Sequence, residues 1–252
     1  MTYRISDTVV GHDLYVSQKA NNLRELLEEV AFSALMLQDA DLARADLASA
    51  NLAEISLPGA DLNNSDLAGA NLEGADLWRT LCCGTNFSGA NLREANLNSA
   101  KFLRTVFQGA DLTDARLNGT NLAEADLAGA NLTRAEFNWI NFAKLKLGGT
   151  KFCEIILDNA DFSAADLVGA DFSEAVLRKA HFNGAQLEKA RFVEADLSLA
   201  DFSDGNLKNA DFSNANLVCA NFAGARITGA IFTGANIDGV AGASFQKKPV
   251  VR

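Results

Sequence analysis

A large apolar side chain recurs at every fifth position of this chain, from Leu37 to Ile237, without one insertion. Of these 41 positions, 24 hold Leu, 14 hold Phe and 2 hold Ile, and the remaining one holds Cys82. A period of five fits neither an α-helix, with about 3.6 residues per turn, nor the alternation of a single strand. The chain can therefore bury one large side chain at each step only if it turns a corner every five residues.

A register of small residues accompanies the large ones. Two residues before each large side chain stands a small residue, which is Ala at 29 of the 41 positions, and Asp or Asn most often lies between the two. Because a large residue at both inward positions would overfill the interior, Ala beside Leu or Phe satisfies close packing. Asp and Asn suit the corners, since their side chains hydrogen-bond to nearby backbone amides. Such repeats are typical of a solenoid, whose units bury their apolar sides by stacking on one another.

The consecutive segments ADLAR, ADLAS and ANLAE over residues 40–54 resemble the pentapeptide-repeat family, whose unit is A(D/N)LXX. The resemblance covers roughly 200 of the 252 residues. It implies an all-β fold, a right-handed quadrilateral β-helix with five residues on each side and about ten 20-residue coils in this chain. The central Leu or Phe and the preceding small residue would point inward, and the other three positions outward. Known members of the family include proteins that bind DNA gyrase as DNA mimics.

The large residues sort into four columns when they are read at intervals of 20. From about residue 142 onward Phe fills two columns, with Phe162 and Phe182 in one and Phe172 and Phe192 in the other, and these columns face each other across the interior. The other two columns are mostly Leu. This ordered alternation predicts a core of stacked aromatic rings. We therefore expect no room for a cofactor inside the coil.

The repeat divides the chain into three segments. Residues 1–31 form an N-terminal segment with a capping helix, residues 32–238 the β-helix and residues 239–252 a C-terminal tail. The sequence NLRELLEEV, which begins at Asn22, has the apolar spacing of an amphipathic helix, and Asn22 followed by Glu25 resembles a capping box. Because open strand edges invite aggregation, we expect this helix to cover the first coil. The tail caps the last coil, mediates dimerisation or is disordered; the sequence leaves these alternatives open.

The sequence contains no motif for catalysis, cofactor binding or metal binding. G-x-S-x-G, a glycine-rich phosphate loop, H-E-x-x-H and C-x-x-C are all missing. The carboxylates recur on outward faces, where burial does not prepare them for acid–base work. The four cysteines have neither metal-ligand nor disulfide spacing, and Cys82 takes an inward position as a small core residue. We therefore expect no enzymatic activity, no cofactor and no metal site.

Signals for membranes or secretion are also missing. No run of about 18 or more apolar residues is present that would span a bilayer. The start of the sequence lacks the basic and then apolar pattern of a signal peptide. We expect a cytoplasmic protein without a membrane partner.

The negative charge of the chain is concentrated near its N-terminus. Of the net charge of −10, residues 25–78 alone account for −10, with eleven acidic residues and one basic residue. Such a field disfavours nucleic acid as a direct partner and favours a basic protein surface, including one that normally holds DNA. Alternatively, Asp is simply the preferred corner residue and the charge keeps the protein soluble. The candidate acidic DNA-mimic face consists of Asp41, Asp46, Glu54, Asp61, Asp66, Glu73 and Asp76.

The outward pattern is least regular over residues 138–157. There Ile156 replaces the usual Asp or Asn, and Val176 stands 20 residues later, so the two should be adjacent on one face. Apolar residues gathered on a surface with Trp among them suit protein binding. The alternative is local drift, in which larger inward residues widen a coil and exposed apolar atoms are tolerated. The candidate protein-binding patch consists of Trp139, Ile156, Val176 and Lys146.

These observations favour a non-enzymatic protein-interaction scaffold, which presents the flat faces of a rigid rod to a protein partner. The alternative is a DNA-mimic protein that binds DNA gyrase or another topoisomerase through the acidic N-terminal coils. A passive module that acts through a neighbouring protein is a third hypothesis, which the sequence does not separate from the first. Under each of them the protein is a monomer, or a homodimer formed through an end of the rod.

Overall fold

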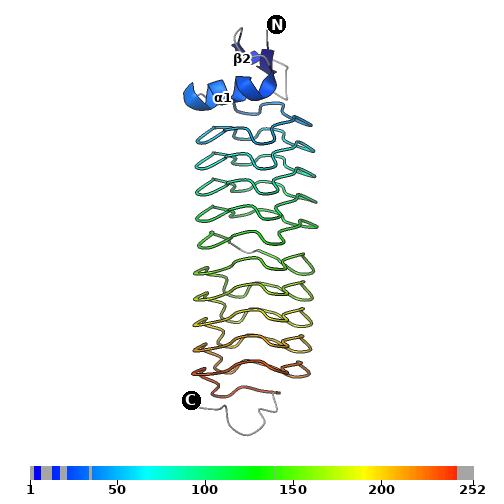
Figure 1. Ribbon diagram of the computed structural model, residues 1–252, viewed down its shortest axis with the longest axis vertical. Coiled ribbons are helices and arrows are strands. Elements are labelled where there is room, and N and C mark those ends of the chain that lie inside the picture. The colour runs from blue at the N-terminus through cyan, green and yellow to red at the C-terminus, as the bar shows by residue number, and fades with distance from the viewer. Residues whose placement is uncertain (1–2, 7–12, 18–21, 34–35, 139, 243–252) are drawn as a thin grey trace. The chain divides into compact units, whose positions relative to one another are not determined.

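The computed structural model describes residues 3–6, 13–17, 22–33, 36–138 and 140–242 of the chain. The chain divides into two compact units. Both are built from the same repeating coil, which can be followed in Figure 1. Unit 1 comprises Met1–Asn131 and Ala135–Asn138, and unit 2 comprises Leu132–Arg134 and Trp139–Arg252.

Consecutive coils pair as parallel β-structure, and the paired residues lie 20 apart in the sequence. In unit 1, Asp41 forms a parallel bridge with Asp61, and in unit 2 Asp161 does so with His181. The backbone N–H of Leu42 donates to the carbonyl of Asp61 at 2.9 Å, and the N–H of Asp61 donates to the carbonyl of Ala40 at 2.9 Å. This pattern confirms the predicted repeat of 20 residues within each unit.

A tight turn ends each group of five residues, and it lies two residues later than we expected. The N–H of Ala45 donates to the carbonyl of Leu42 at 3.2 Å, and Arg44 between them has a φ of 60°. A positive φ at the third residue is the mark of a type II turn. The prediction that Asp and Asn occupy the corners was therefore wrong in detail, because they occupy the bridge positions. Asp41 still acts on the turn, since its Oδ1 accepts the N–H of Ala43 at 3.3 Å.

The core of unit 1 is filled from the two inward positions, as predicted. Leu47 and Leu67 are buried, and so is the small residue before each. Where Ser replaces Ala, as at Ser65, its hydroxyl donates to the carbonyl of Leu62 at 2.7 Å, which satisfies the buried oxygen. Cys82 is also buried, and desolvation raises the pKa of its thiol to about 12. The interpretation of Cys82 as a small core residue is confirmed.

Two ladders of aromatic rings fill the core of unit 2. The rings of Phe162 and Phe182 are stacked with centroids 4.9 Å apart and an interplanar angle of 5°. Phe172 belongs to the facing ladder, and its ring meets that of Phe182 edge to face at 5.6 Å. This combination of stacking along a ladder and edge contacts between ladders is the geometry that aromatic rings prefer. It confirms the predicted pair of facing Phe columns.

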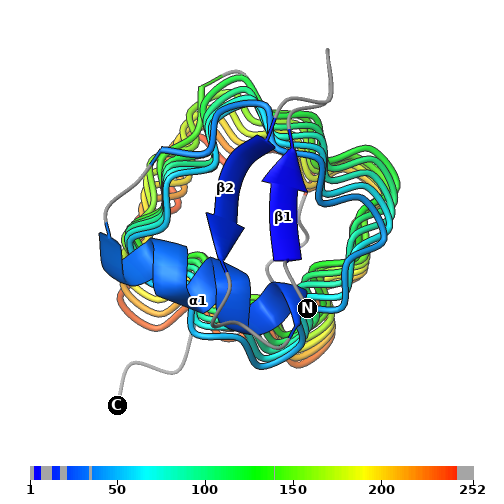
Figure 2. The same cartoon turned by 90° about the horizontal axis from the view of Figure 1, so that it is seen from above.

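A small hairpin and a helix precede the first coil of unit 1. Strand β1 (Tyr3–Ser6) pairs antiparallel with β2 (Asp13–Ser17), and α1 spans Leu23–Ser33. Figure 2 shows β1 and β2 across the end of the coil and α1 along one side of it. The carbonyl of Ser6 accepts the N–H of Asp41 at 2.8 Å, so β1 reaches the exposed edge of the first coil.

Helix α1 has an apolar face that is turned away from solvent. Leu26, Leu27 and Val30 are fully buried. At the start of the helix, Asn22 Oδ1 accepts the N–H of Glu25 at 2.9 Å, which satisfies one of the free donors of the first turn. Among the described residues, no helix has both the length and the apolar character to cross a bilayer.

Polar contacts attach α1 to the first coil. Glu28 accepts the backbone N–H of Asn51 at 2.9 Å, and Arg24 lies 3.4 Å from Asp46. The first of these contacts supplies an acceptor to an N–H at the edge of the coil. An amide left without a partner there would be open to pairing with another chain.

Candidate protein-binding surfaces

Ile156 and Val176 form an apolar pair on one side of unit 2. They are joined by a parallel bridge, so their side chains lie one coil apart on the same face. Ile156 is 66% exposed and Val176 is half-buried. Both take the position that Asp or Asn fills in most of the five-residue repeats. The predicted adjacency of these two residues is confirmed.

The other two members of the predicted patch do not extend this pair. Lys146 forms a bridge with Asp166. It stands ten residues before Ile156, a separation of two five-residue sides, and it therefore lies on the opposite side of the coil. Trp139 lies outside the described residues. Within the part of unit 2 that the structure describes, the patch therefore reduces to Ile156 and Val176.

The acidic residues of unit 1 do not gather on one face. Asp41 and Asp61 form one two-membered ladder, and Asp46 and Asp66 form another on the next side. Asp76 forms a bridge with Ser56 on a third side of the coil. Glu54 and Glu73 occupy turns beside the fourth side, which carries Asn51 and Asn71. The backbone of duplex DNA presents continuous rows of negatively charged phosphates, whereas each ladder of carboxylates here has only two members. All four sides share the acidity of this part of the chain.

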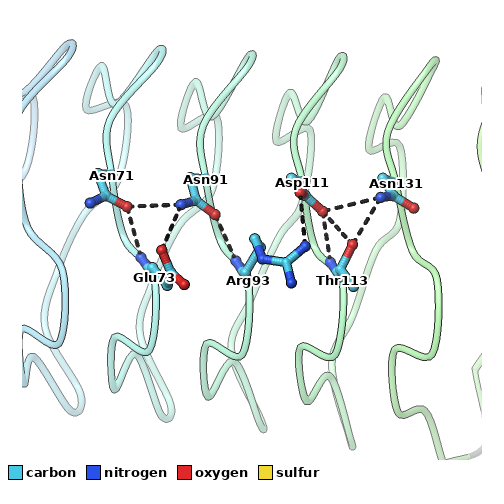
Figure 3. Close-up of polar contacts among 7 residues, drawn as sticks. All are labelled: Asn71, Glu73, Asn91, Arg93, Asp111, Thr113 and Asn131. Atoms are coloured by element: carbon cyan, nitrogen blue, oxygen red, sulfur yellow. Dashed lines mark hydrogen bonds and ion pairs between the residues drawn. The ribbon is translucent and has the colours of Figure 1, made fainter.

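Neutral amides continue the polar ladders of unit 1, as Figure 3 shows. Asn91 donates through Nδ2 to Asn71 Oδ1 at 3.0 Å and to Glu73 Oε2 at 3.2 Å. Farther along, Asn131 donates to Asp111 Oδ1 at 3.3 Å. In this ladder, Asn131 beside Asp111 avoids the repulsion that two stacked carboxylates would experience. This side of the coil is thus held by hydrogen bonds between successive coils.

Asp111 is the carboxylate of this ladder, and it has several hydrogen-bond donors around it. The Thr113 backbone N–H donates to its Oδ1 at 3.1 Å, the Thr113 hydroxyl donates to the same oxygen, and Arg93 lies 3.5 Å from Oδ2. Desolvation by burial raises the pKa of Asp111, but these donors together outweigh it, and the pKa lies below its ordinary value. Asp111 therefore stays charged and accepts hydrogen bonds from its neighbours in the ladder. A lowered pKa does not suit a carboxyl group that has to donate a proton.

A groove of about 580 Å³ crosses three successive coils of unit 1, and we call it the Trp78 groove. Sequence reasoning missed it, because its residues come from three coils and are far apart in sequence. The signal was present, since Gln38, Pro58 and Trp78 stand at intervals of 20 in equivalent turns. The groove is lined by Met36, Gln38, Asp39, Pro58, Gly59, Asp76, Trp78, Arg79 and Leu81.

Both apolar and charged side chains line the Trp78 groove. Trp78 is 43% exposed and Met36 is 63% exposed, while Pro58 between them is buried. The guanidinium carbon of Arg79 lies 5.0 Å from the centre of the indole ring, a cation–π arrangement. Asp76 Oδ1 accepts the N–H of Trp78 at 3.2 Å. This hydrogen bond connects the turn that holds Trp78 to the bridge position at Asp76.

A glycine makes room for the second carboxylate of the groove. Gly59 has a φ of 73°, and a Cβ at this position would collide with the carboxylate of Asp39. The Asp39 side chain therefore lies over Gly59. The side-chain amide of the neighbouring Gln38 donates to Asp39 Oδ2 at 3.3 Å, and the Asp39 side chain is half-buried.

The described residues contain no group of three or more His, Cys, Asp or Glu side chains that could hold a metal ion. The thiol of Cys153 is partly buried, and desolvation raises its pKa. Cys82 is fully buried. Neither thiol therefore has the lowered pKa of a reactive cysteine.

Two family models match the chain. One, described as a pentapeptide repeat region, matches residues 155–241. The other, described as pentapeptide repeats in eight copies, matches residues 40–79, 85–123, 110–144 and 120–159. No curated protein gives a significant match.

Solved structures of pentapeptide repeat proteins are similar to the chain. HetL, involved in heterocyst differentiation regulation in the cyanobacterium Nostoc, is 30% identical, with a TM-score of 0.38 and coverage of 88% of this chain and 97% of HetL. QnrB1, a plasmid-mediated fluoroquinolone resistance protein, is 21% identical, with a TM-score of 0.38 and coverage of 84% and 90%. A protein from the Arabidopsis thaliana thylakoid lumen is 40% identical, with a TM-score of 0.27 and coverage of 38% and 68%.

The assignment of the family depends on sequence. The two family models together extend over most of residues 40–241. HetL is 30% identical over nearly its whole length. Both findings agree with the five-residue turns and the 20-residue bridges of the structure. The chain belongs to the pentapeptide-repeat family.

Proposed function

We propose that this protein is a non-enzymatic scaffold, which binds another protein through the side of unit 2 that carries Ile156 and Val176. The observation that carries the proposal is the exposure of Ile156, 66%, directly beside Val176, where both residues take the position that holds Asp or Asn in most five-residue repeats. An apolar pair that replaces a polar ladder weakens the solubility of that side, and covering it removes apolar area from water.

The repeat makes such a side well suited to binding. The backbone of each coil is hydrogen-bonded to its neighbours, as where the N–H of Val176 donates to the carbonyl of Ile155 at 2.8 Å. The core beneath is filled by Phe162 and Phe172, whose rings meet edge to face at 5.5 Å. A surface that is already ordered loses little conformational entropy when a partner binds. The binding residues are therefore presented in a fixed arrangement.

Replacing the apolar pair by the polar residues of an ordinary coil tests this proposal. Ile156→Asp with Val176→Asn recreates the Asp–Asn ladder that Asp76 and Asn96 form at 2.8 Å in unit 1. The double variant should therefore fold normally. In affinity capture from an extract of the source organism, we expect recovery of the partner to fall about tenfold or more.

Val168→Asp provides the matched control. Val168 is also an exposed apolar residue, but it lies in the turn after Asp166, and Asp166 stands ten residues from both Ile156 and Val176, on the opposite side of the coil. The control should capture the same partner as the wild-type protein. Equal capture by the double variant would remove this side of the coil from consideration, and circular dichroism checks that both variants are folded.

The DNA-mimic function is a second proposal, which the negative charge of residues 25–78 supports. Its difficulty is geometric, because the carboxylates lie on four sides and form ladders of only two members, such as Asp41 and Asp61. A DNA-binding groove would meet one or two sides at a time. We therefore prefer the scaffold, and inhibition of DNA gyrase supercoiling by the protein would reverse that preference.

We also propose the finer features of the fold that the family resemblance implies. These are a right-handed coil, about ten coils in all, and α1 as a cap on the first of them. The contacts of Glu28 with Asn51 and of Ser6 with Asp41 support the role of a cap, since both satisfy backbone donors at the edge of the coil.

A further inference from the structure

The Trp78 groove has the chemistry of a binding site for a short basic and apolar segment. Met36 and Trp78 in its lining expose apolar surface, and Pro58, which also lines it, is buried. Asp39 and Asp76 place carboxylates at the same surface, where Arg79 already stacks on the indole ring. Exposed Trp and Met side chains beside a concave surface are typical anchors for protein segments.

The charge around the groove narrows the choice of occupant. Every residue of the groove except Arg79 and Leu81 lies within residues 25–78, which hold eleven acidic residues and one basic residue. An acidic or neutral segment would gain nothing from this field, whereas a segment with several cations would be attracted to it. The occupant should therefore combine cations with an aromatic or aliphatic side chain.

The chain itself contains such a segment. Residues 243–252, ASFQKKPVVR, hold Phe245, Lys247, Lys248 and Arg252 and no acidic residue, so their side chains sum to +3. They follow Gly242, the last described residue of unit 2. Ten extended residues span up to about 33 Å. The groove crosses three coils, or about 10 Å at the spacing of paired strands, so the segment is long enough to fill it.

We propose that the Trp78 groove of one copy binds residues 243–252 of a second copy. The groove belongs to the first three coils of unit 1 and the segment follows the last described coil of unit 2, so each copy offers both halves of the contact. Such an interface is heterologous, because the two surfaces that meet are different. Copies therefore associate head to tail, and the association does not stop at a dimer unless a ring closes.

The first test measures binding of the isolated segment to the full chain. A fluorescein-labelled peptide with the sequence of residues 243–252 is titrated with protein at low salt, and its anisotropy is recorded. We expect saturable binding that Trp78→Ala weakens about tenfold or more and Asp76→Asn weakens about threefold to tenfold. Added salt should weaken binding further, because the field is screened.

The controls alter equivalent residues away from the groove. Asp166 accepts the N–H of Val168 at 3.4 Å, as Asp76 accepts that of Trp78, so Asp166→Asn and Val168→Ala match the two groove variants. Both should bind the peptide like the wild-type protein. A peptide carrying Phe245→Ala should bind more weakly with its charge unchanged. The proposal fails if nothing binds, if the groove variants bind normally, or if the controls lose binding equally.

The second test uses whole chains in sedimentation velocity. The wild-type protein should form larger species as its concentration rises, and Lys247→Glu with Lys248→Glu should abolish this. A mixture of Trp78→Ala, which keeps its tail, with that tail variant, which keeps its groove, should form a one-to-one complex and nothing larger. Masses that do not change with concentration, or a mixture that stays monomeric, would overturn the proposal and exclude a contact between copies.

Discussion

Phe182→Ala should lower the free energy of unfolding by about 3–5 kcal/mol, the usual cost of truncating a buried Phe. The ring of Phe182 is fully buried, and it stacks on Phe162 at 4.9 Å and on Phe202 at 5.0 Å. It also meets Phe172 and Phe192 edge to face, each at 5.6 Å. Removing it leaves a cavity bordered by four rings. The coil cannot collapse around this cavity, because its backbone is hydrogen-bonded to the coils on both sides.

Phe182→Leu is the matched control for this prediction. Leu fills the same inward position in coils of unit 1, such as at Leu62, so the side chain is compatible with the backbone. The expected loss is at most about 1.5 kcal/mol. Urea unfolding followed by circular dichroism measures both variants. If Phe182→Ala cost no more than Phe182→Leu, the ring ladder would not be a packed core.

Ala180→Leu should be the second large effect, a destabilisation of about 3 kcal/mol through overpacking. Ala180 is fully buried at the small inward position, and the N–H of Asp201 in the next coil donates to its carbonyl at 2.9 Å. A larger side chain here must push a Phe ring from its ladder or separate the coils. At the equivalent position of another coil, a Cβ on Gly205 would already lie 3.1 Å from a backbone carbonyl.

Ala180→Ser separates size from polarity. The small inward position accepts hydroxyls elsewhere, since Thr80 donates to Leu77 O at 2.8 Å and Thr105 to Cys82 O at 2.6 Å. A Ser at 180 can make the same bond to the carbonyl of Leu177, so we expect a loss below about 1 kcal/mol. Thermal unfolding compares the two variants. Equal losses would show that the small residue is not required by its volume.

The interior of the coil could be predicted from the sequence because each inward position has a steric reason. Leu or Phe beside Ala fills a tube whose wall turns every five residues, and Phe162 stacked on Phe182 follows from their interval of 20. The corner was harder to place. Asp41 acts on the turn through its side chain while it sits on the bridge, and composition alone does not distinguish the two roles.

The surfaces were predicted less well, because outward side chains have no steric requirement that ties them to one position. The Ile156–Val176 pair was found because both fill the same outward position one interval apart. Lys146 was grouped with them because it is close in sequence, although two turns separate it from Ile156. The Trp78 groove was missed for the opposite reason, since its residues come from three coils and are far apart in sequence.

Spin labels placed 20 residues apart test the vertical registry, on which the core, the ladders and both surfaces depend. Glu188 and Lys208 lie one coil apart in unit 2, with their charged groups 3.6 Å from each other. Ser198 stands ten residues from each, on the opposite side of the coil. Labels are attached to cysteines at 188 and 208, or at 188 and 198, in a chain where the accessible native cysteines are replaced by Ser.

Buried Cys82 can remain in that chain, because its thiol is shielded from the label. The account predicts a strongly broadened electron paramagnetic resonance spectrum for the 188 and 208 pair, whose backbones are about 5 Å apart, and narrow lines for the 188 and 198 pair. Narrow lines for both pairs, or equal broadening in both, would contradict it.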